Sequence, residues 1–102
     1  MVFDYIIFKK AEEDLDEIID YIGSDNPEAA LKLYDTFLKQ FEYLSQFPEV
    51  GRLRREFTPV VRSLPVGNYV IFFQEASPVE IVRILHGARL ITQKYFKGEN
   101  MG

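Results

Sequence analysis

The last third of the chain, from Val60 to Tyr95, alternates short apolar segments with turn residues. The apolar segments are rich in β-branched and aromatic residues, which favour strands. Proline- and glycine-containing turns separate them, and connections this short join neighbouring antiparallel strands. The pattern therefore predicts three consecutive antiparallel strands, at residues 58–64, 69–75 and 79–85.

The first half of the chain predicts a strand followed by two helices. Residues 2–8 are β-prone, and from Lys9 onward apolar residues recur at helical spacing. Asn26 and Pro27 suit the N-cap and the first position of a second helix, which is expected to run to about Phe47. Because the link between the helices is short, we expect them to pack as an antiparallel hairpin.

The predicted order is therefore βααβββ, an α+β fold with a small antiparallel sheet. We expect a single domain over residues 1–96 and a flexible C-terminal tail over residues 97–102.

Strict alternation along the last two strands predicts that both faces of the sheet are apolar. An α-hairpin covers only one face, so the other needs the chain's own C-terminal segment, a second copy, or a partner segment. In the middle strand Tyr69, Ile71 and Phe73 share one face, and Val70 and Phe72 share the other. In the last strand the two sets are Val79, Ile81, Arg83 and Leu85, and Val82, Ile84 and His86.

Composition excludes several classes of site. The chain has no cysteine, which excludes disulfides and thiolate metal sites. It has neither a membrane-length apolar run nor a signal-peptide pattern, so we expect a cytoplasmic protein. No nucleotide-binding or zinc motif occurs, and we expect no cofactor and no metal.

The net charge of −4 hides a strong asymmetry along the chain. Residues 1–50 contain 4 Lys/Arg and 12 Asp/Glu, whereas residues 51–102 contain 8 Lys/Arg and 4 Asp/Glu. Six acids crowd the first helix: Glu12, Glu13, Asp14, Asp16, Glu17 and Asp20. A solvated helix face explains them, and a basic partner is the alternative.

Polar groups near the end of the last strand could form a phosphate-cleaving site or have structural roles. Cations there would hold phosphates, and histidine or tyrosine could move a proton in phosphodiester cleavage. Arginines on strands also pair with acids or lie over apolar surface, and a lone histidine is more often structural. The candidates are Arg62, Arg83, His86, Arg89 and Tyr95.

Several motifs, taken together, resemble a known family. In the first half they are Ala11, Asp14-Leu15, Ile18-x-x-Tyr21-Ile22 and Asn26-Pro27-x-Ala29-Ala30. In the second half they are Pro48-x-x-Gly51-Arg52, Val61-Arg62, Val66-Gly67-x-Tyr69-x-Ile71-Phe72-Phe73 and Val82-Arg83-Ile84-Leu85-His86-Gly87-x-Arg89. Their order and spacing over residues 3–96 resemble ParE-type toxins of the RelE/ParE superfamily, the plasmid stabilisation proteins.

The resemblance implies the βααβββ fold and a toxin whose gene is paired with an antitoxin gene. ParE-like members are described as DNA gyrase inhibitors without known catalytic residues, whereas RelE-like members cut ribosome-bound mRNA. The RNase pattern has a Tyr-Arg pair on the middle strand, but here Val70 follows Tyr69. ParE-like chains usually have an aspartate after His-Gly-x-Arg, but here Leu90 follows Arg89.

We therefore expect a ParE-like toxin that binds gyrase and has no catalytic residue. The implied partners are a ParD-like antitoxin, which wraps the toxin in a hetero-oligomer, and gyrase. We expect neither DNA binding by the toxin alone nor membrane association. The expected gyrase contacts are Arg83, Arg89, Lys94 and Tyr95. The expected antitoxin contacts are Leu15, Ile19, Tyr34, Phe37, Phe41, Val70 and Phe72. The alternatives are a RelE-like endonuclease and a degenerate toxin that only binds its antitoxin.

Overall fold

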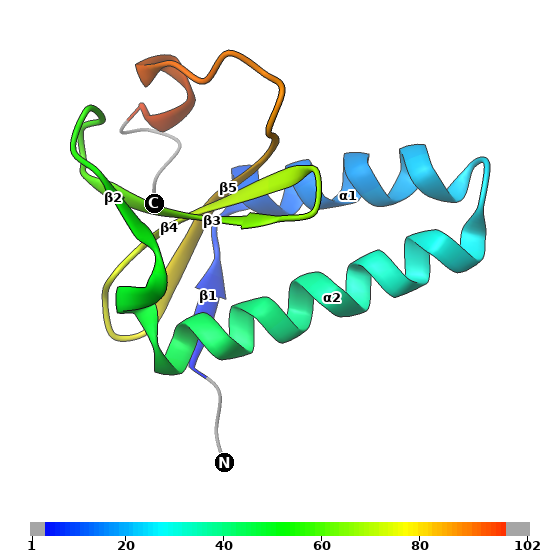
Figure 1. Ribbon diagram of the computed structural model, residues 1–102, viewed down its shortest axis with the longest axis horizontal. Helices are drawn as coiled ribbons and strands as arrows, with labels where there is room; N and C mark the ends of the chain where they lie inside the picture. Colours follow the sequence, from blue (N-terminus) through cyan, green and yellow to red (C-terminus); the bar gives the residue numbers. More distant parts are fainter. Residues whose placement is uncertain (1–3, 98–102) are drawn as a thin grey trace.

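The computed structural model describes residues 4–97 and contains a helical hairpin packed on a five-stranded sheet (Figure 1). The sheet order is β1-β5-β4-β3-β2. In chain order the elements are β1 (Tyr5–Ile7), α1 (Lys9–Gly23), α2 (Pro27–Gln46), the 3-10 helix η1 (Pro48–Val50), β2 (Arg52–Arg54), β3 (Val61–Val66), β4 (Tyr69–Gln74), β5 (Val79–His86) and the 3-10 helix η2 (Gln93–Phe96).

The α+β class and the order of the main elements are confirmed, with two differences in the sheet. Residues 52–54 form an additional edge strand, β2, antiparallel to β3. β1 lies beside β5 and runs parallel to it, with Tyr5 opposite Val79. The sheet is therefore mixed: the three consecutive strands β3, β4 and β5 are antiparallel as predicted, and β1 adds a parallel pair at one edge. Of the expected tail, residues 98–102 lie outside the described part of the chain.

The start of α2 follows the predicted capping chemistry. The Asn26 side chain accepts a hydrogen bond from the Ala29 N–H at 3.1 Å, and Pro27 occupies the first helical position. The cap satisfies one of the N–H groups that a helix start leaves without a partner. This sharp start lets α2 turn back along α1 as the expected hairpin.

The larger hydrophobic core lies between the hairpin and one face of the sheet. Phe37, Phe41 and Leu44 of α2 are fully buried there. They pack with Ala11 and Leu15 of α1 and with Val66, Ile71, Phe73, Val79, Ile81 and Ile84 of the sheet. Gly51 is needed beside this core because a Cβ at that position would lie 2.3 Å from the Phe73 ring.

A second core covers the opposite face of the sheet. Phe57, from the β2–β3 connection, and Phe96, from η2, pack on Phe72 with ring centroids 6.4 and 5.1 Å from its own. Gln93 and Thr58 exchange two hydrogen bonds that join the same two segments. In Figure 1 the C-terminal segment (orange to red) lies on the side of the sheet away from α2. Of the three covers considered, the chain's own C-terminal segment is the one present.

A register irregularity in the β4–β5 pair changes which residues of β5 share a face. Phe72 lies opposite Arg83 but Phe73 lies opposite Ile81, so Val82 is an extra residue. Beyond this bulge, Ile84 joins the helix-side core and Leu85 the second core. The prediction that Val79, Ile81, Arg83 and Leu85 share one face was therefore wrong after Ile81.

We predict that Phe96→Ala lowers the free energy of unfolding by about 3–5 kcal/mol, the usual cost of removing a buried phenylalanine side chain. The matched control is Leu90→Ala in the same segment, because Leu90 is 82% exposed. It should change stability by less than about 0.5 kcal/mol. Urea denaturation of both variants checks this, and similar losses would contradict the role of Phe96 as the cover of Phe72.

Candidate functional site

One carboxylate of the acidic first helix is buried. Asp14 is only 7% exposed and accepts three hydrogen bonds. Its Oδ2 accepts from Arg83 Nε at 2.7 Å and from the Ile84 N–H at 3.0 Å, and its Oδ1 accepts from Arg83 Nη2 at 2.8 Å. This bidentate pair joins α1 to β5 across 69 residues of sequence.

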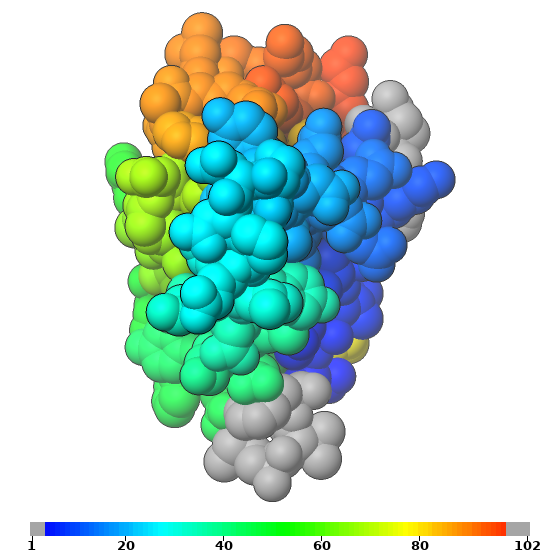
Figure 2. All heavy atoms as spheres, turned by 90° about the vertical axis from the view of Figure 1, so that its right-hand side faces the viewer, coloured from blue at the N-terminus to red at the C-terminus, as the bar shows by residue number. Residues whose placement is uncertain are grey.

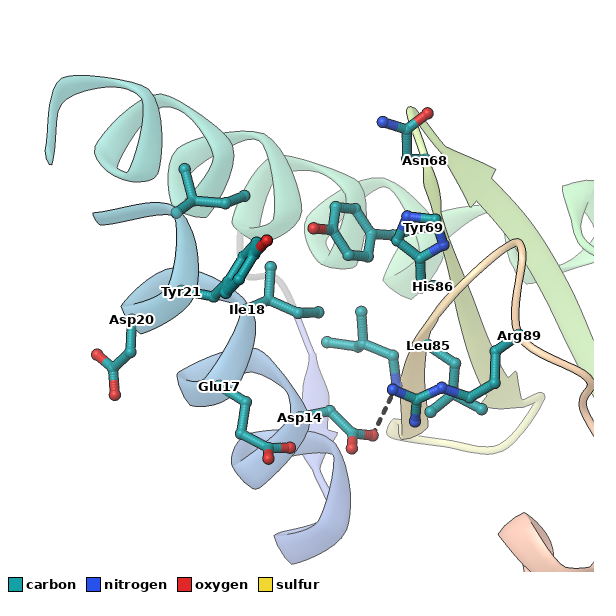
Figure 3. Close-up of a pocket in the computed structure, with 12 residues that line it drawn as sticks. Asp14, Glu17, Ile18, Asp20, Tyr21, Asn68, Tyr69, Leu85, His86 and Arg89 are labelled. Carbon is teal, nitrogen blue, oxygen red and sulfur yellow. Dashed lines mark hydrogen bonds between the residues drawn. The ribbon is translucent and has the colours of Figure 1, made fainter. Parts of the chain in front are cut away.

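The contact has a structural cause at the edge of the sheet. β1 ends at Ile7 and pairs β5 only as far as Ile81, so the next part of the β5 edge has no strand beside it. α1 runs along this edge, and Asp14 accepts a hydrogen bond from the Ile84 N–H, which no strand pairs (dashed line in Figure 3). A buried N–H without an acceptor would cost about 1–3 kcal/mol. Asp14 thus satisfies an N–H of the β5 edge beyond the end of β1.

Arg83 continues this contact to the C-terminal segment. Its Nη1 donates to the Tyr95 carbonyl at 3.3 Å, and its guanidinium lies 5.2 Å from the centroid of the Tyr95 ring. The hydrogen bonds to Asp14 raise the pKa of Arg83, which is mostly buried. Arg83 was expected to contact the target, but its charge is already neutralised inside the domain.

The other three expected target contacts, two exposed cations and the half-buried Tyr95, lie together. Arg89 and Lys94 lie 5.9 and 5.5 Å from the Tyr95 ring centroid. Both cations are exposed, and neither forms an ion pair within residues 4–97. We call Arg89, Lys94 and Tyr95 the Tyr95 cluster. Two cationic side chains therefore lie near the Tyr95 ring, and Arg83 contacts both this ring and the Tyr95 carbonyl.

Of the residues of the RNase alternative, Arg83, Arg89 and Tyr95 lie together, but Arg62 does not join them. Arg62 lies opposite Phe73 and Arg83 opposite Phe72, and successive β4 residues point to opposite faces. Arg62 is also engaged, because it donates to Glu75 at 3.0 Å and to the Gly51 carbonyl at 2.8 Å.

His86 takes part in local structure at the end of β5. Its Nδ1 accepts from the Ala88 N–H at 3.1 Å, and its ring packs edge-on against Tyr69 with centroids 5.3 Å apart. The Nδ1 bond supports the turn that follows the strand. This geometry assigns His86 a structural role.

Most residues expected to contact the antitoxin lie inside the domain. Leu15, Phe37, Phe41 and Phe72 are buried in the two cores, so their side chains offer no surface to a partner. The apolar sides of the helices pack on one face of the sheet, and the chain itself covers the other face. These four side chains are therefore core residues and not the antitoxin contacts that we expected. Ile19 and Val70 are half-buried and Tyr34 is exposed, so these three remain accessible.

An open groove of about 890 Å³ separates the second half of α1 from the end of the β4–β5 hairpin (Figure 3). Ile18 and Tyr21 point from α1 toward Tyr69, with Glu17 and Asp20 along the same helix. His86 and Arg89 line the opposite wall. We call this space the α1–β5 groove. Figure 2 shows the molecule from the side of the α1–α2 turn (cyan), with the segment that follows β5 (orange) at the top of the view.

Sequence reasoning missed Asp14 and Tyr21 as site residues. Asp14 was grouped with the solvated acids, although its spacing from Ala11 and Ile18 puts it on the apolar side of α1. That spacing was the available signal. Tyr21 was noted only as a motif residue, and nothing in its spacing indicates its 80% exposure.

Residues 4–97 contain neither a membrane-spanning helix nor a cluster of metal ligands. No helix there is long and apolar enough to cross a bilayer. No group of three or more potential ligands from histidine, cysteine, aspartate or glutamate comes together for a metal ion in that range.

Comparisons with known proteins agree with the resemblance seen in the sequence. Residues 5–91 match the family described as ParE toxin of type II toxin–antitoxin system, parDE. The chain is 41% identical to Toxin RelE2 of Caulobacter vibrioides over 83 residues, which are 79% of this chain and 91% of that protein. A solved structure described as the chromosomal ParDE TA system from P. aeruginosa superposes with a TM-score of 0.68 at 28% identity. That match covers 82% of this chain and 95% of the other.

We predict that Asp14→Ala lowers the free energy of unfolding by about 3–5 kcal/mol, because it leaves the Arg83 charge buried without a partner. The double variant Asp14→Leu/Arg83→Met should recover much of this loss, since it removes both charges together. Asp16→Ala, at an exposed position of the same helix, is the control and should change stability by less than about 0.5 kcal/mol. Denaturant titrations of the variants measure the coupling, and additive losses would contradict it.

Proposed function

Because the chain belongs to the ParE toxin family of type II toxin–antitoxin systems, we propose that it inhibits DNA gyrase by binding it. A cognate ParD-like antitoxin binds the toxin and neutralises it. The toxin acts in the cytoplasm, without turnover, and the two proteins form a hetero-oligomer. The toxin–antitoxin setting of the superposed structure supports the antitoxin partner.

The Tyr95 cluster is the observation that carries the gyrase proposal. Its two cations are exposed and form no ion pair within residues 4–97, and the Arg83 contacts hold the half-buried Tyr95 on the sheet. A docking surface gains from such preorganisation, because less side-chain freedom is lost on binding. Arginine and tyrosine are also enriched among residues that dominate binding energy.

A ribosome-dependent mRNA endonuclease is the second candidate, and the name of the Caulobacter relative, Toxin RelE2, favours it. Transition-state stabilisation of phosphodiester cleavage needs several cations at one phosphate. Here Val70 replaces an arginine of that pattern, Arg62 is on the other face of the sheet, and Arg83 is paired with Asp14. These features support binding over cleavage. A toxin that binds only its antitoxin is the third outcome.

We predict that the purified protein inhibits supercoiling by gyrase and that Arg89→Glu/Lys94→Glu raises the half-inhibitory concentration at least about tenfold, a loss of about 1.4 kcal/mol. The physical reason is the reversal of both exposed charges of the Tyr95 cluster. The measurement is a gel assay of plasmid supercoiling against toxin concentration.

The control for this variant is Lys32→Glu/Lys39→Glu, which changes the net charge equally on the exposed surface of α2. It should leave inhibition within about twofold, because exposed pairs such as Lys39–Asp35 contribute little. A translation-dependent mRNA cleavage assay runs beside it. Cleavage without loss of supercoiling would favour the endonuclease, and inactivity in both assays would favour the degenerate toxin.

A further inference from the structure

The two sides of the sheet carry opposite charge. The helical hairpin, residues 9–46, contains 4 Lys/Arg and 10 Asp/Glu. The two segments that cover the second core, residues 52–60 and 87–97, contain 6 Lys/Arg and 1 Asp/Glu. Because the hairpin packs on one face and these segments on the other, the sheet separates the acidic part of the chain from the basic part. We call the outer surface of these two segments the basic face.

The two segments of the basic face are held together as one surface. Beneath it the ring centroids of Phe57 and Phe96 are 4.6 Å apart. The Thr58 N–H donates to Gln93 Oε1 at 2.8 Å, and Lys94 follows Gln93 directly. The cations that follow β2 and those of the Tyr95 cluster therefore belong to adjoining parts of the same surface.

Two cations on the β2 side of this face have no acidic partner within residues 4–97. Arg52 and Arg55 are exposed and form no ion pair there. Arg54 differs, because it bonds Glu56 at 2.9 Å and lies over the Phe57 ring. Arg52 is two residues before Arg54 on β2, so both side chains point to the face of the second core. The β2 side thus presents two guanidinium groups that the described chain does not neutralise.

This arginine pair lacks an aromatic contact of the kind that protein partners bury. The neighbouring ring of Phe57 is only 4% exposed, and Leu53 alternates to the other face of the sheet. Protein interfaces have an apolar or aromatic centre, as the Tyr95 cluster offers with its half-buried ring. A phosphate backbone is bound by arginine charge and hydrogen bonds alone. The β2 side therefore fits a phosphate backbone better than a protein surface.

The net charge of −4 restricts where such a contact can form. A chain with this charge is repelled by free DNA, and two arginines give only weak phosphate binding. When a partner holds both the toxin and the DNA, the effective concentration of the DNA rises to about the millimolar range. Weak phosphate contacts then add to the affinity for that partner. DNA gyrase supplies this setting, because duplex DNA is its substrate.

We propose that Arg52 and Arg55 contact the phosphate backbone of the duplex DNA that gyrase holds, while the Tyr95 cluster contacts the enzyme. This rests on the proposed function, because gyrase must place the DNA beside the bound toxin. The two surfaces adjoin on the basic face, so one gyrase–DNA complex can meet both. Phosphate contacts carry no sequence information, and the DNA contribution should therefore be independent of base sequence.

The test measures toxin binding to immobilised gyrase by surface plasmon resonance, with and without a bound linear duplex. The duplex should strengthen binding at least about fivefold at about 50 mM salt. The gain should shrink as salt is raised. Each phosphate contact contributes about 0.9 to the slope of log affinity against log salt, so two arginines should make the slope about 1.8 steeper with DNA.

The variant Arg52→Gln/Arg55→Gln should lose the gain from DNA and the extra salt slope, and its affinity for DNA-free gyrase should stay within about twofold. Both positions are exposed, so the variant should remain folded, as thermal denaturation will verify. The control is Lys32→Gln/Lys39→Gln, which removes the same charge from exposed positions of α2 on the hairpin side. It should keep the gain from DNA within about twofold.

Three results would overturn the DNA contact. DNA leaves the affinity unchanged, both double variants lose the gain equally, or Arg52→Gln/Arg55→Gln weakens binding to DNA-free gyrase by the same factor. In the last case the arginines contact the protein. Each of these results retains gyrase binding, so the proposed function would stand. A toxin that binds gyrase neither with nor without DNA would contradict both proposals.

Discussion

The contact among Asp14, Arg83 and the Ile84 N–H determines how the main parts of this domain are joined. It connects α1 to β5 and, through Arg83, connects β5 to Tyr95 in the C-terminal segment. A buried carboxylate and a buried guanidinium are each costly alone, so each requires the other in place. Its position follows from the short β1. A longer first strand would have paired the β5 edge itself and left no site for a side chain from α1.

The two cores show how a small chain covers both apolar faces of its sheet. The helical hairpin covers one face, and two short segments, around Phe57 and Phe96, cover the other. The hydrogen bonds between Thr58 and Gln93 join these segments to each other, and Arg83 joins the second of them to the sheet. The C-terminal segment therefore contributes both to stability and to the position of the Tyr95 cluster.

Local patterns predicted the elements of this fold better than their pairing. Asn26, Pro27 and the apolar spacing of α1 and α2 gave the hairpin, because capping and helical period depend on neighbouring residues. The parallel pairing of β1 with β5 could not be predicted in the same way, since those strands are more than 70 residues apart. The bulge at Val82 was also invisible, because one extra residue reverses the faces beyond it without changing the composition.

The site was predicted in part for the same reasons. Arg89, Lys94 and Tyr95 are close in sequence, so a local turn is enough to bring them together. The short helix η2 provides that turn. The partners of Arg83 depend on the distant Asp14, and the burial of Phe72 depends on Phe96, so the proposed interfaces included residues that the domain uses itself.

The end of β5 contributes to both the Tyr95 cluster and the α1–β5 groove. The strand supplies Arg83 to the Tyr95 cluster on one side and Leu85 and His86 to the α1–β5 groove on the other. Arg89, three residues beyond the strand, reaches both sites. The groove and the cluster are therefore adjacent surfaces that share the Arg89 side chain.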